Sequence, residues 1–127
     1  MALTHINTTT VSVSDQDTAL DFYVNKLGFE VRSDQPMGPG MRWLVVGLPG
    51  AQTGIVLAKG YGAGEPGKFT GMVFSTDDIQ ATYEELRDKG VPFSEPPTMQ
   101  PWGMMQALFA DQDGNGYVLV GAQAQAE

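Results

Sequence analysis

The chain has 127 residues, a net charge of −8 and no cysteine. This length is typical of one domain, and 42% hydrophobic residues can form a buried core. The acidic balance argues against a nucleic-acid partner, since phosphate binding needs a basic face. Without cysteine, disulfides, thiolate metal sites and cysteine nucleophiles are excluded. The apolar runs are far shorter than the roughly 20 residues of a membrane span, and the N-terminus lacks a secretory pattern, so we expect a cytoplasmic protein without a membrane partner.

The sequence repeats itself with a constant shift of 62 residues. The shift pairs Gly28 with Gly90 and residues 55–57 with residues 117–119, without a gap. Acidic residues gather in the second half, with ten acids and three bases in residues 62–127 against five acids and four bases before them. Such a half can attract a cationic ligand or simply form a solvated surface.

The first module, residues 1–59, begins with a strand over Thr8–Val13, which is rich in β-branched residues. Ser14 or Asp15 can cap the helix that follows, because a side-chain oxygen accepts from the free amides of the first turn. Apolar residues recur at helical spacing, and Gly28 can adopt the left-handed conformation that ends a helix. Three strands are predicted after it, over Phe29–Arg32, Arg42–Gly47 and Thr53–Lys59.

A connector over residues 60–68, with four glycines and a proline, leads to the second module, residues 69–121. This module is predicted to have a strand over Phe69–Phe74 and a helix that begins with a capping box of Asp77 and Gln80 and stops at Gly90. Its last strands are predicted over Val91–Phe93, Met104–Ala110 and Tyr117–Val120. We therefore predict a single α+β domain over residues 1–127, in which two βαβββ modules form an open, curved eight-stranded sheet.

Three motifs resemble reactive sites. The connector segment Gly62–Lys68 approaches a phosphate-binding loop, but Phe69 replaces the required Ser or Thr and a strand follows, which indicates a linker. Residues 111–116 match the first half of a calcium loop, yet the twelfth position is Ala122, and a hairpin that uses Asn115-Gly116 explains them. His5, the only histidine, has no serine in a G-x-S-x-G elbow and is interpreted as a surface residue.

Aromatic and sulfur-containing residues gather in corresponding strands of the two modules. Met37, Met41 and Trp43 belong to one strand and the loop before it, and Trp102, Met104, Met105 and Phe109 to its counterpart. Ordinary packing explains much of this, because methionine fills gaps in cores. Trp102 lies in a predicted loop, where a core role is harder to justify, and it can stack on a ligand.

Segments at both ends of the chain resemble the vicinal-oxygen-chelate superfamily, which includes glyoxalases, bleomycin-resistance proteins and extradiol dioxygenases. The opening is carried by Val11–Asp15, Ala19–Tyr23 and Leu27–Phe29, and the close by Phe109–Asn115 and Val118–Val120. The resemblance implies two modules around a cleft and a homodimer, often with sites shared between subunits.

Metalloenzymes of that superfamily hold a divalent metal with His or Glu on four inner strands. Carried over, those positions fall on Thr8, Val56, Gly71 or Thr70, and Val118, none of which ligates as imidazole or carboxylate does. We therefore expect no metal and no cofactor. Val56 and Val118, at equivalent positions of the two modules, would instead give the cleft a dry, apolar floor. In this respect the chain resembles the resistance-type members, which sequester a drug without transforming it.

Three functions are compatible with the sequence. The first, which we favour, is metal-independent sequestration of an aromatic or cationic small molecule, with no catalytic residue. Its expected cleft is floored by Thr8, Thr10, Val56 and Val118 and walled by Trp43, Trp102, Met104 and Phe109. The second is a lyase, isomerase or dioxygenase with an atypical metal site helped by His5, Glu30 or Asp34. The third is a non-catalytic partner-binding or regulatory fold whose cleft is filled by its own side chains.

Overall fold

A computed structural model describes residues 2–61 and 64–122. The chain divides into two compact units, Met1–Gly67 (unit 1) and Lys68–Glu127 (unit 2), and the division falls inside the expected connector. Two residues of the phosphate-loop candidate, Gly62 and Ala63, lie outside the described residues, as does the tail from residue 123. The phosphate-loop candidate is followed by a strand, β5 (Phe69–Thr76), and not by the helix that a phosphate-binding loop requires.

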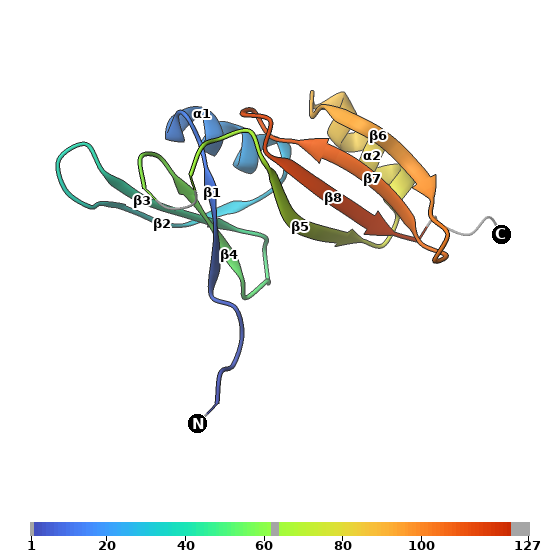
Figure 1. Cartoon of the computed structure of the whole chain (residues 1–127), viewed down its shortest axis with the longest axis horizontal. Helices are drawn as coiled ribbons and strands as arrows, with labels where there is room; N and C mark the ends of the chain where they lie inside the picture. The colour runs from blue at the N-terminus through green and yellow to red at the C-terminus, as the bar shows by residue number, and fades with distance from the viewer. Residues whose placement is uncertain (1, 62–63, 123–127) are drawn as a thin grey trace. The chain divides into compact units, whose positions relative to one another are not determined.

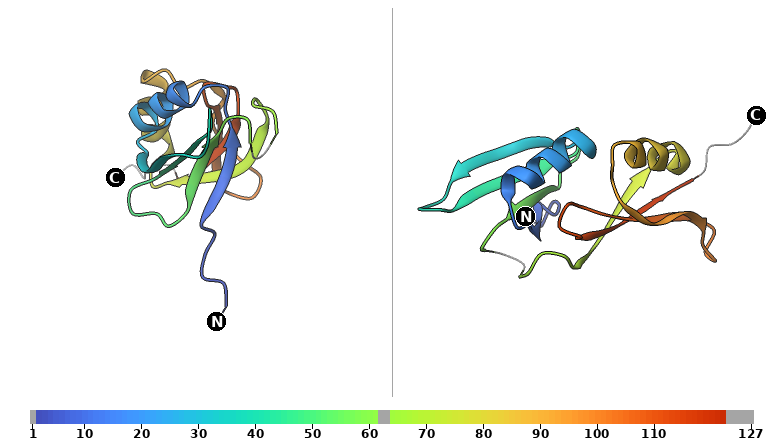
Figure 2. Two further views of the ribbon diagram at one scale, coloured as in Figure 1. Left: turned by 90° about the vertical axis from the view of Figure 1, so that its left-hand side faces the viewer. Right: turned by 90° about the horizontal axis from the view of Figure 1, so that it is seen from above.

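Unit 1 consists of one four-stranded sheet (sheet 1) with a helical segment on one face (Figures 1 and 2). The strand order is β1-β4-β3-β2, with β1 parallel to β4 and the other neighbours antiparallel. This is the predicted βαβββ order. The elements are β1 (Thr8–Ser12), α1 (Gln16–Asp21), the π-helix η1 (Phe22–Lys26), β2 (Glu30–Pro36), β3 (Arg42–Gly47) and β4 (Gly54–Ala58).

The helical segment of unit 1 begins and ends where the sequence indicates. The Asp15 carboxylate accepts hydrogen bonds from the Asp17 backbone N–H and the Thr18 hydroxyl, each at 3.0 Å. Gly28, with φ of 85°, follows the last turn. The second half of the segment is a π-helix, in which the Leu27 N–H donates to the Phe22 carbonyl five residues earlier.

Unit 2 repeats this arrangement with a second four-stranded sheet (sheet 2) in the order β5-β8-β7-β6. Its helix is capped by Asp78, whose carboxylate accepts from the Ala81 N–H at 3.1 Å, so the predicted cap at Asp77 is wrong by one residue. Gly90, with φ of 92°, follows the helix as predicted. The elements are β5 (Phe69–Thr76), α2 (Ile79–Asp88), β6 (Phe93–Met99), β7 (Met105–Ala110) and β8 (Gly116–Gly121).

The α+β fold and the two βαβββ modules are confirmed, and the eight predicted strands form two four-stranded sheets. The largest difference is in the edge strands. The strand that follows each helix was predicted over only four residues (Phe29–Arg32) and three residues (Val91–Phe93), yet β2 and β6 each have seven residues. Strand β2 contains Pro36, and β6 contains Pro96 and Pro97. An edge strand tolerates proline, because an N–H that points away from the sheet has no partner to lose.

Each helix covers one face of its own sheet and forms the core there. In unit 1 the completely buried Ala19, Tyr23, Leu44 and Leu57 belong to this core. In unit 2 the helix side chain Tyr83 meets Phe93 edge-on at 4.8 Å between ring centroids. Among the described residues of each unit, no helix covers the opposite face of the sheet. None of the helices within residues 2–61 and 64–122 is long and apolar enough to span a membrane.

Candidate functional site

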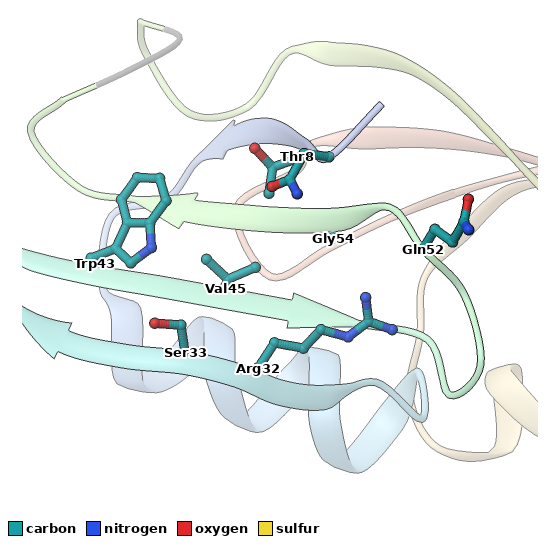
Figure 3. A pocket seen from close by; sticks show the side chains of 8 residues that line it. Thr8, Arg32, Ser33, Trp43, Val45, Gln52 and Gly54 are labelled. Carbon is teal, nitrogen blue, oxygen red and sulfur yellow. The ribbon is translucent and has the colours of Figure 1, made fainter. Parts of the chain in front are cut away.

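A hollow of about 320 Å³ lies on the face of sheet 1 that the helix does not cover (Figure 3). Strand β3 contributes Trp43 and Val45 to it, because residues two apart in a strand point to the same face. The lining combines an indole, a cation, hydroxyls and amides. It consists of Asn7, Thr8, Arg32, Ser33, Trp43, Val45, Gln52 and Gly54.

A glycine keeps the middle of the hollow open. Gly54 pairs with Gly47 across β3 and β4 and with Thr8 across β1 and β4. A Cβ atom on Gly54 would lie 2.9 Å from Val45 Cγ1 and 3.2 Å from the Val46 carbonyl oxygen. A side chain at this position would therefore require the Val45 side chain to shift and the Val46 carbonyl to give slightly. The missing side chain therefore leaves space between the threonine and valine on either side.

Arg32 reaches the hollow through an irregularity in the sheet. The register between β2 and β3 shifts between Val31 and Ser33, so Arg32 has no partner directly opposite it in β3. Its guanidinium lies over Gly47, and Nη2 donates to the Leu48 carbonyl at 2.6 Å. In Figure 3 it stands with Gln52 at the end of the hollow opposite Trp43.

A second arginine, Arg42, precedes Trp43 in β3 and is engaged in ion pairs within unit 1. Arg42 makes a two-pronged ion pair with Asp34, at 2.8 and 2.9 Å, and a third contact with Asp17 at 2.8 Å. The hydrogen bonds from Arg42 hold the pKa of the Asp34 carboxyl below its ordinary value and raise the pKa of the guanidinium further. The buried Gln16 amide donates to the carbonyls of Arg42 (3.0 Å) and Leu57 (2.8 Å). Strand β3 is thereby tied to helix α1 at the residue before Trp43.

The predicted floor residue Val56 is covered by a side chain from the connector. Val56 is 1% exposed and forms a cluster with Val45 and Ala58, against which Tyr61 packs. The Tyr61 hydroxyl donates to the Arg42 carbonyl. The hollow therefore opens beside Val56, over Val45 and Gly54. Of the predicted residues, Thr8 and Trp43 line it, whereas the half-buried Thr10 pairs with Val56 on the covered side.

The other four predicted site residues belong to unit 2. Trp102 lies 67% exposed in the turn between β6 and β7, which is closed by the Gln100 N–H donating to the Met104 carbonyl at 2.9 Å. Phe109 pairs with Tyr117 and stacks on its ring at 5.4 Å, inside the aromatic core. Val118 pairs with the residue before Phe109 and so lies on the opposite face of sheet 2. Phe109 is a core residue and is left out of the proposed site.

The residues at the positions of the superfamily's metal ligands do not fit a divalent ion. Thr8 offers one hydroxyl and Val56 none, and no group of three or more His, Asp or Glu that could hold a metal occurs in the described part of the chain. Of the alternative ligands, His5 is exposed with Nδ1 3.0 Å from the Thr4 hydroxyl, Glu30 is exposed, and Asp34 is engaged by Arg42.

The acidic turn between β7 and β8 uses its carboxylate internally. Asp111 is 3% exposed and accepts from the backbone N–H groups of Asp113 and Asn115 and from the Asn115 side-chain amide, each at 2.9 Å. Gly114, with φ of 82°, makes the reversal. The turn is thus a hairpin, as predicted, although its left-handed residue is Gly114 rather than the Asn115-Gly116 pair.

Comparison with known proteins agrees with this architecture. The family model described as Glyoxalase/Bleomycin resistance protein/Dioxygenase superfamily matches residues 5–119. The chain belongs to this superfamily. Among relatives, the uncharacterized protein YetH of Bacillus subtilis (strain 168) is 38% identical over 115 residues, which cover 90% of this chain and 95% of YetH.

Solved structures of superfamily members are also similar. A member from Sphaerobacter thermophilus DSM 20745 is 43% identical, with a TM-score of 0.89 over 94% of this chain and 98% of that one. The crystal structure of TnmS3, an antibiotic binding protein from Streptomyces sp. CB03234, is 39% identical, with a TM-score of 0.85 over 97% of this chain and 99% of TnmS3.

Several lining residues were missed by reasoning from the sequence, chiefly Arg32, Ser33, Gln52 and Gly54. Arg32 was placed at the end of a short strand, and the register shift that turns it toward the hollow has no local pattern. A usable signal was the pair of glycines, Gly47 and Gly54, in two mostly apolar strands. Glycine inside a strand often marks a close approach by another group, which here is the arginine over Gly47.

Proposed function

We propose that this protein binds a flat aromatic small molecule in the hollow on sheet 1 and holds it without chemical conversion. The observation that carries the proposal is the indole of Trp43, 37% exposed, at one end of a hollow of about 320 Å³. Small-molecule sites typically have a volume of this order, with a few polar groups placed around an apolar surface. The ring of Trp43 offers a flat face on which an aromatic ligand can stack.

Two further observations support binding rather than catalysis. The superfamily's metal positions carry Thr8 and Val56 in unit 1, which cannot polarise a substrate as a bound metal ion does. In addition, TnmS3, with 39% identity, is described as an antibiotic binding protein. A role in sequestering an antibiotic-like compound follows from that similarity as part of the proposal. The homodimer implied by the resemblance stays a prediction.

The proposal is tested by NMR titration of the ¹⁵N-labelled chain with 2-naphthamide, a neutral bicyclic aromatic. The Trp43 indole N–H and the amides of Val45 and Gly54 are expected to shift together and saturate. The compound should be recovered unchanged, and prior treatment with EDTA should leave the affinity unchanged. Shifts confined to residues away from the hollow, loss of binding with EDTA, or appearance of a product would each contradict the proposal.

A further inference from the structure

We propose that the hollow selects aromatic ligands that carry an anionic oxygen group, which Arg32 binds at the end opposite Trp43. This inference deepens the proposed function and depends on it. It replaces the cationic ligand considered from the sequence with an anionic one. The lining residues carry one formal charge, the guanidinium of Arg32, and no carboxylate.

Arg32 has donors to spare for a ligand. A guanidinium carries five N–H groups, and one hydrogen bond, from Nη2 to the Leu48 carbonyl, holds it in place. Among residues 2–61 and 64–122, no carboxylate lies within ion-pair distance of Arg32. The nearby Asp34 is engaged by Arg42 instead. The positive charge in the hollow is therefore not neutralised by the protein, and a planar carboxylate can bind it through two parallel hydrogen bonds.

Gly47 provides a seat for this guanidinium. A Cβ atom on Gly47 would lie 2.5 Å from Nε and 2.7 Å from Nη2 of Arg32, so any other residue would displace the side chain. The backbone carbonyl of Leu48 then fixes one edge of the guanidinium. Such a position, with the flat group resting on a glycine and anchored by one hydrogen bond, orients the remaining donors in advance of binding.

The spacing along β3 fits an aromatic acid. Trp43 and Gly47 are four residues apart, which corresponds to about 13 Å along a strand. Figure 3 shows Trp43 at one end of the hollow and Arg32 with Gln52 at the other, with Val45 between them. A bicyclic ring can rest over Val45 and against the indole while its acid group reaches the guanidinium.

The net charge of −8 does not oppose this selection strongly. Unit 1 is nearly neutral up to residue 61, with five acids and four bases. Exposed charges farther away than the Debye length of about 8 Å at physiological ionic strength are largely screened. Arg32 would touch the ligand directly, so the local charge outweighs the distant ones.

The test compares three probes of one shape: 2-naphthoate (anionic), 2-naphthamide (neutral) and 2-naphthylmethylammonium (cationic). The dissociation constants are measured by NMR titration of the full chain at low and high salt. We expect the naphthoate to bind about tenfold more tightly than the amide, in line with an exposed charge-assisted hydrogen bond, and the cation to bind most weakly. Half-molar salt should reduce the preference.

Variants locate the preference at Arg32. Arg32→Met keeps much of the length of the side chain without its charge. It should abolish the preference, so that naphthoate and naphthamide bind with about equal affinity. Lys59→Met, which removes a charge from an exposed residue outside the lining, should leave it unchanged. Gly47→Ala retains the arginine but displaces the guanidinium, and it should also lose most of the preference.

The outcomes separate this inference from the proposed function. Equal affinity of the wild-type chain for naphthoate and naphthamide, or a preference that survives Arg32→Met, would overturn the inference alone. If none of the three probes shifts the hollow residues, the proposed function fails and the inference fails with it.

Discussion

Replacing Trp43 with alanine is the most direct test of the site. A tryptophan side chain has roughly 250 Å² of surface, so an exposed fraction of 37% leaves about 90 Å² for a ligand. A ring stacked on one face covers about half of this, roughly 45 Å². At about 25 cal/mol per Å² that burial contributes ~1.1 kcal/mol, and stacking geometry adds ~0.5 kcal/mol. The dissociation constant for 2-naphthamide should therefore rise about six- to fifteenfold.

The second tryptophan provides the matched control. The chain has two tryptophans, so each of the two indole N–H signals in an NMR spectrum is assigned by its loss in Trp43→Ala or Trp102→Ala. Trp102 lies in unit 2, is 67% exposed and does not line the hollow. We expect Trp102→Ala to bind naphthamide with wild-type affinity and to retain the shift of the Trp43 signal.

Either of two results would contradict a stacking role for Trp43. A dissociation constant for Trp43→Ala within twofold of wild type would mean that the indole does not contact the ligand. An equal loss in Trp102→Ala would show that a residue of unit 2 takes part in binding, as considered from the sequence, and the hollow on sheet 1 would then not be the whole site.

Three further predictions concern the cap, the ion pair and the hollow. Asp78→Ala should lower the free energy of unfolding in urea by about 1 kcal/mol, because it removes the cap of α2, whereas Asp77→Ala should be neutral; the reverse order would restore the cap predicted from sequence. Arg42→Gln should raise the pKa of Asp34 toward about 3.9 in a ¹³C NMR titration. Since the pKa of Asp34 is depressed in the folded wild type, the ion pair stabilises the fold above the ordinary pKa of an aspartate, about 3.9, and this contribution is lost as the pH falls through the depressed value. An unchanged Asp34 titration in Arg42→Gln would contradict the ion pair. Gly54→Ala should weaken naphthamide binding and cost about 1–3 kcal/mol of stability from overpacking; tight binding by a stable variant would show that the ligand lies elsewhere.

Local patterns predicted the elements of this fold well, because caps, glycine stops and apolar periodicity act within a few residues. Asp15, Gly28 and Gly90 have the roles that the sequence indicates. The cap of α2 is Asp78 rather than Asp77, because either of two adjacent aspartates can accept a hydrogen bond from the first turn, and the sequence pattern does not distinguish them. The order of the two modules was predicted from the 62-residue repeat, because the pattern of one helix or strand alone does not reveal it.

The candidate site was predicted only in part, because it depends on contacts between distant segments. Thr8 and Trp43, both expected in the cleft, line the hollow, and strand alternation fixes their face once the sheet exists. Val56 was not recognised as covered, because Tyr61 reaches it from a glycine-rich segment with no periodicity. The pairing of Phe109 with Tyr117, which turns Phe109 into the core, likewise depends on strand register rather than composition.

The position of Tyr61 has a consequence for changing the size of ligand that this protein accepts. Tyr61 packs against the apolar cluster of Val45, Val56 and Ala58, of which Val45 also lines the hollow. A smaller residue at position 61 would extend the accessible space over a dry surface while leaving Trp43 and Arg32 in place. Variation at this one residue of the connector is therefore a simple way to accommodate longer polycyclic compounds without rebuilding the strands.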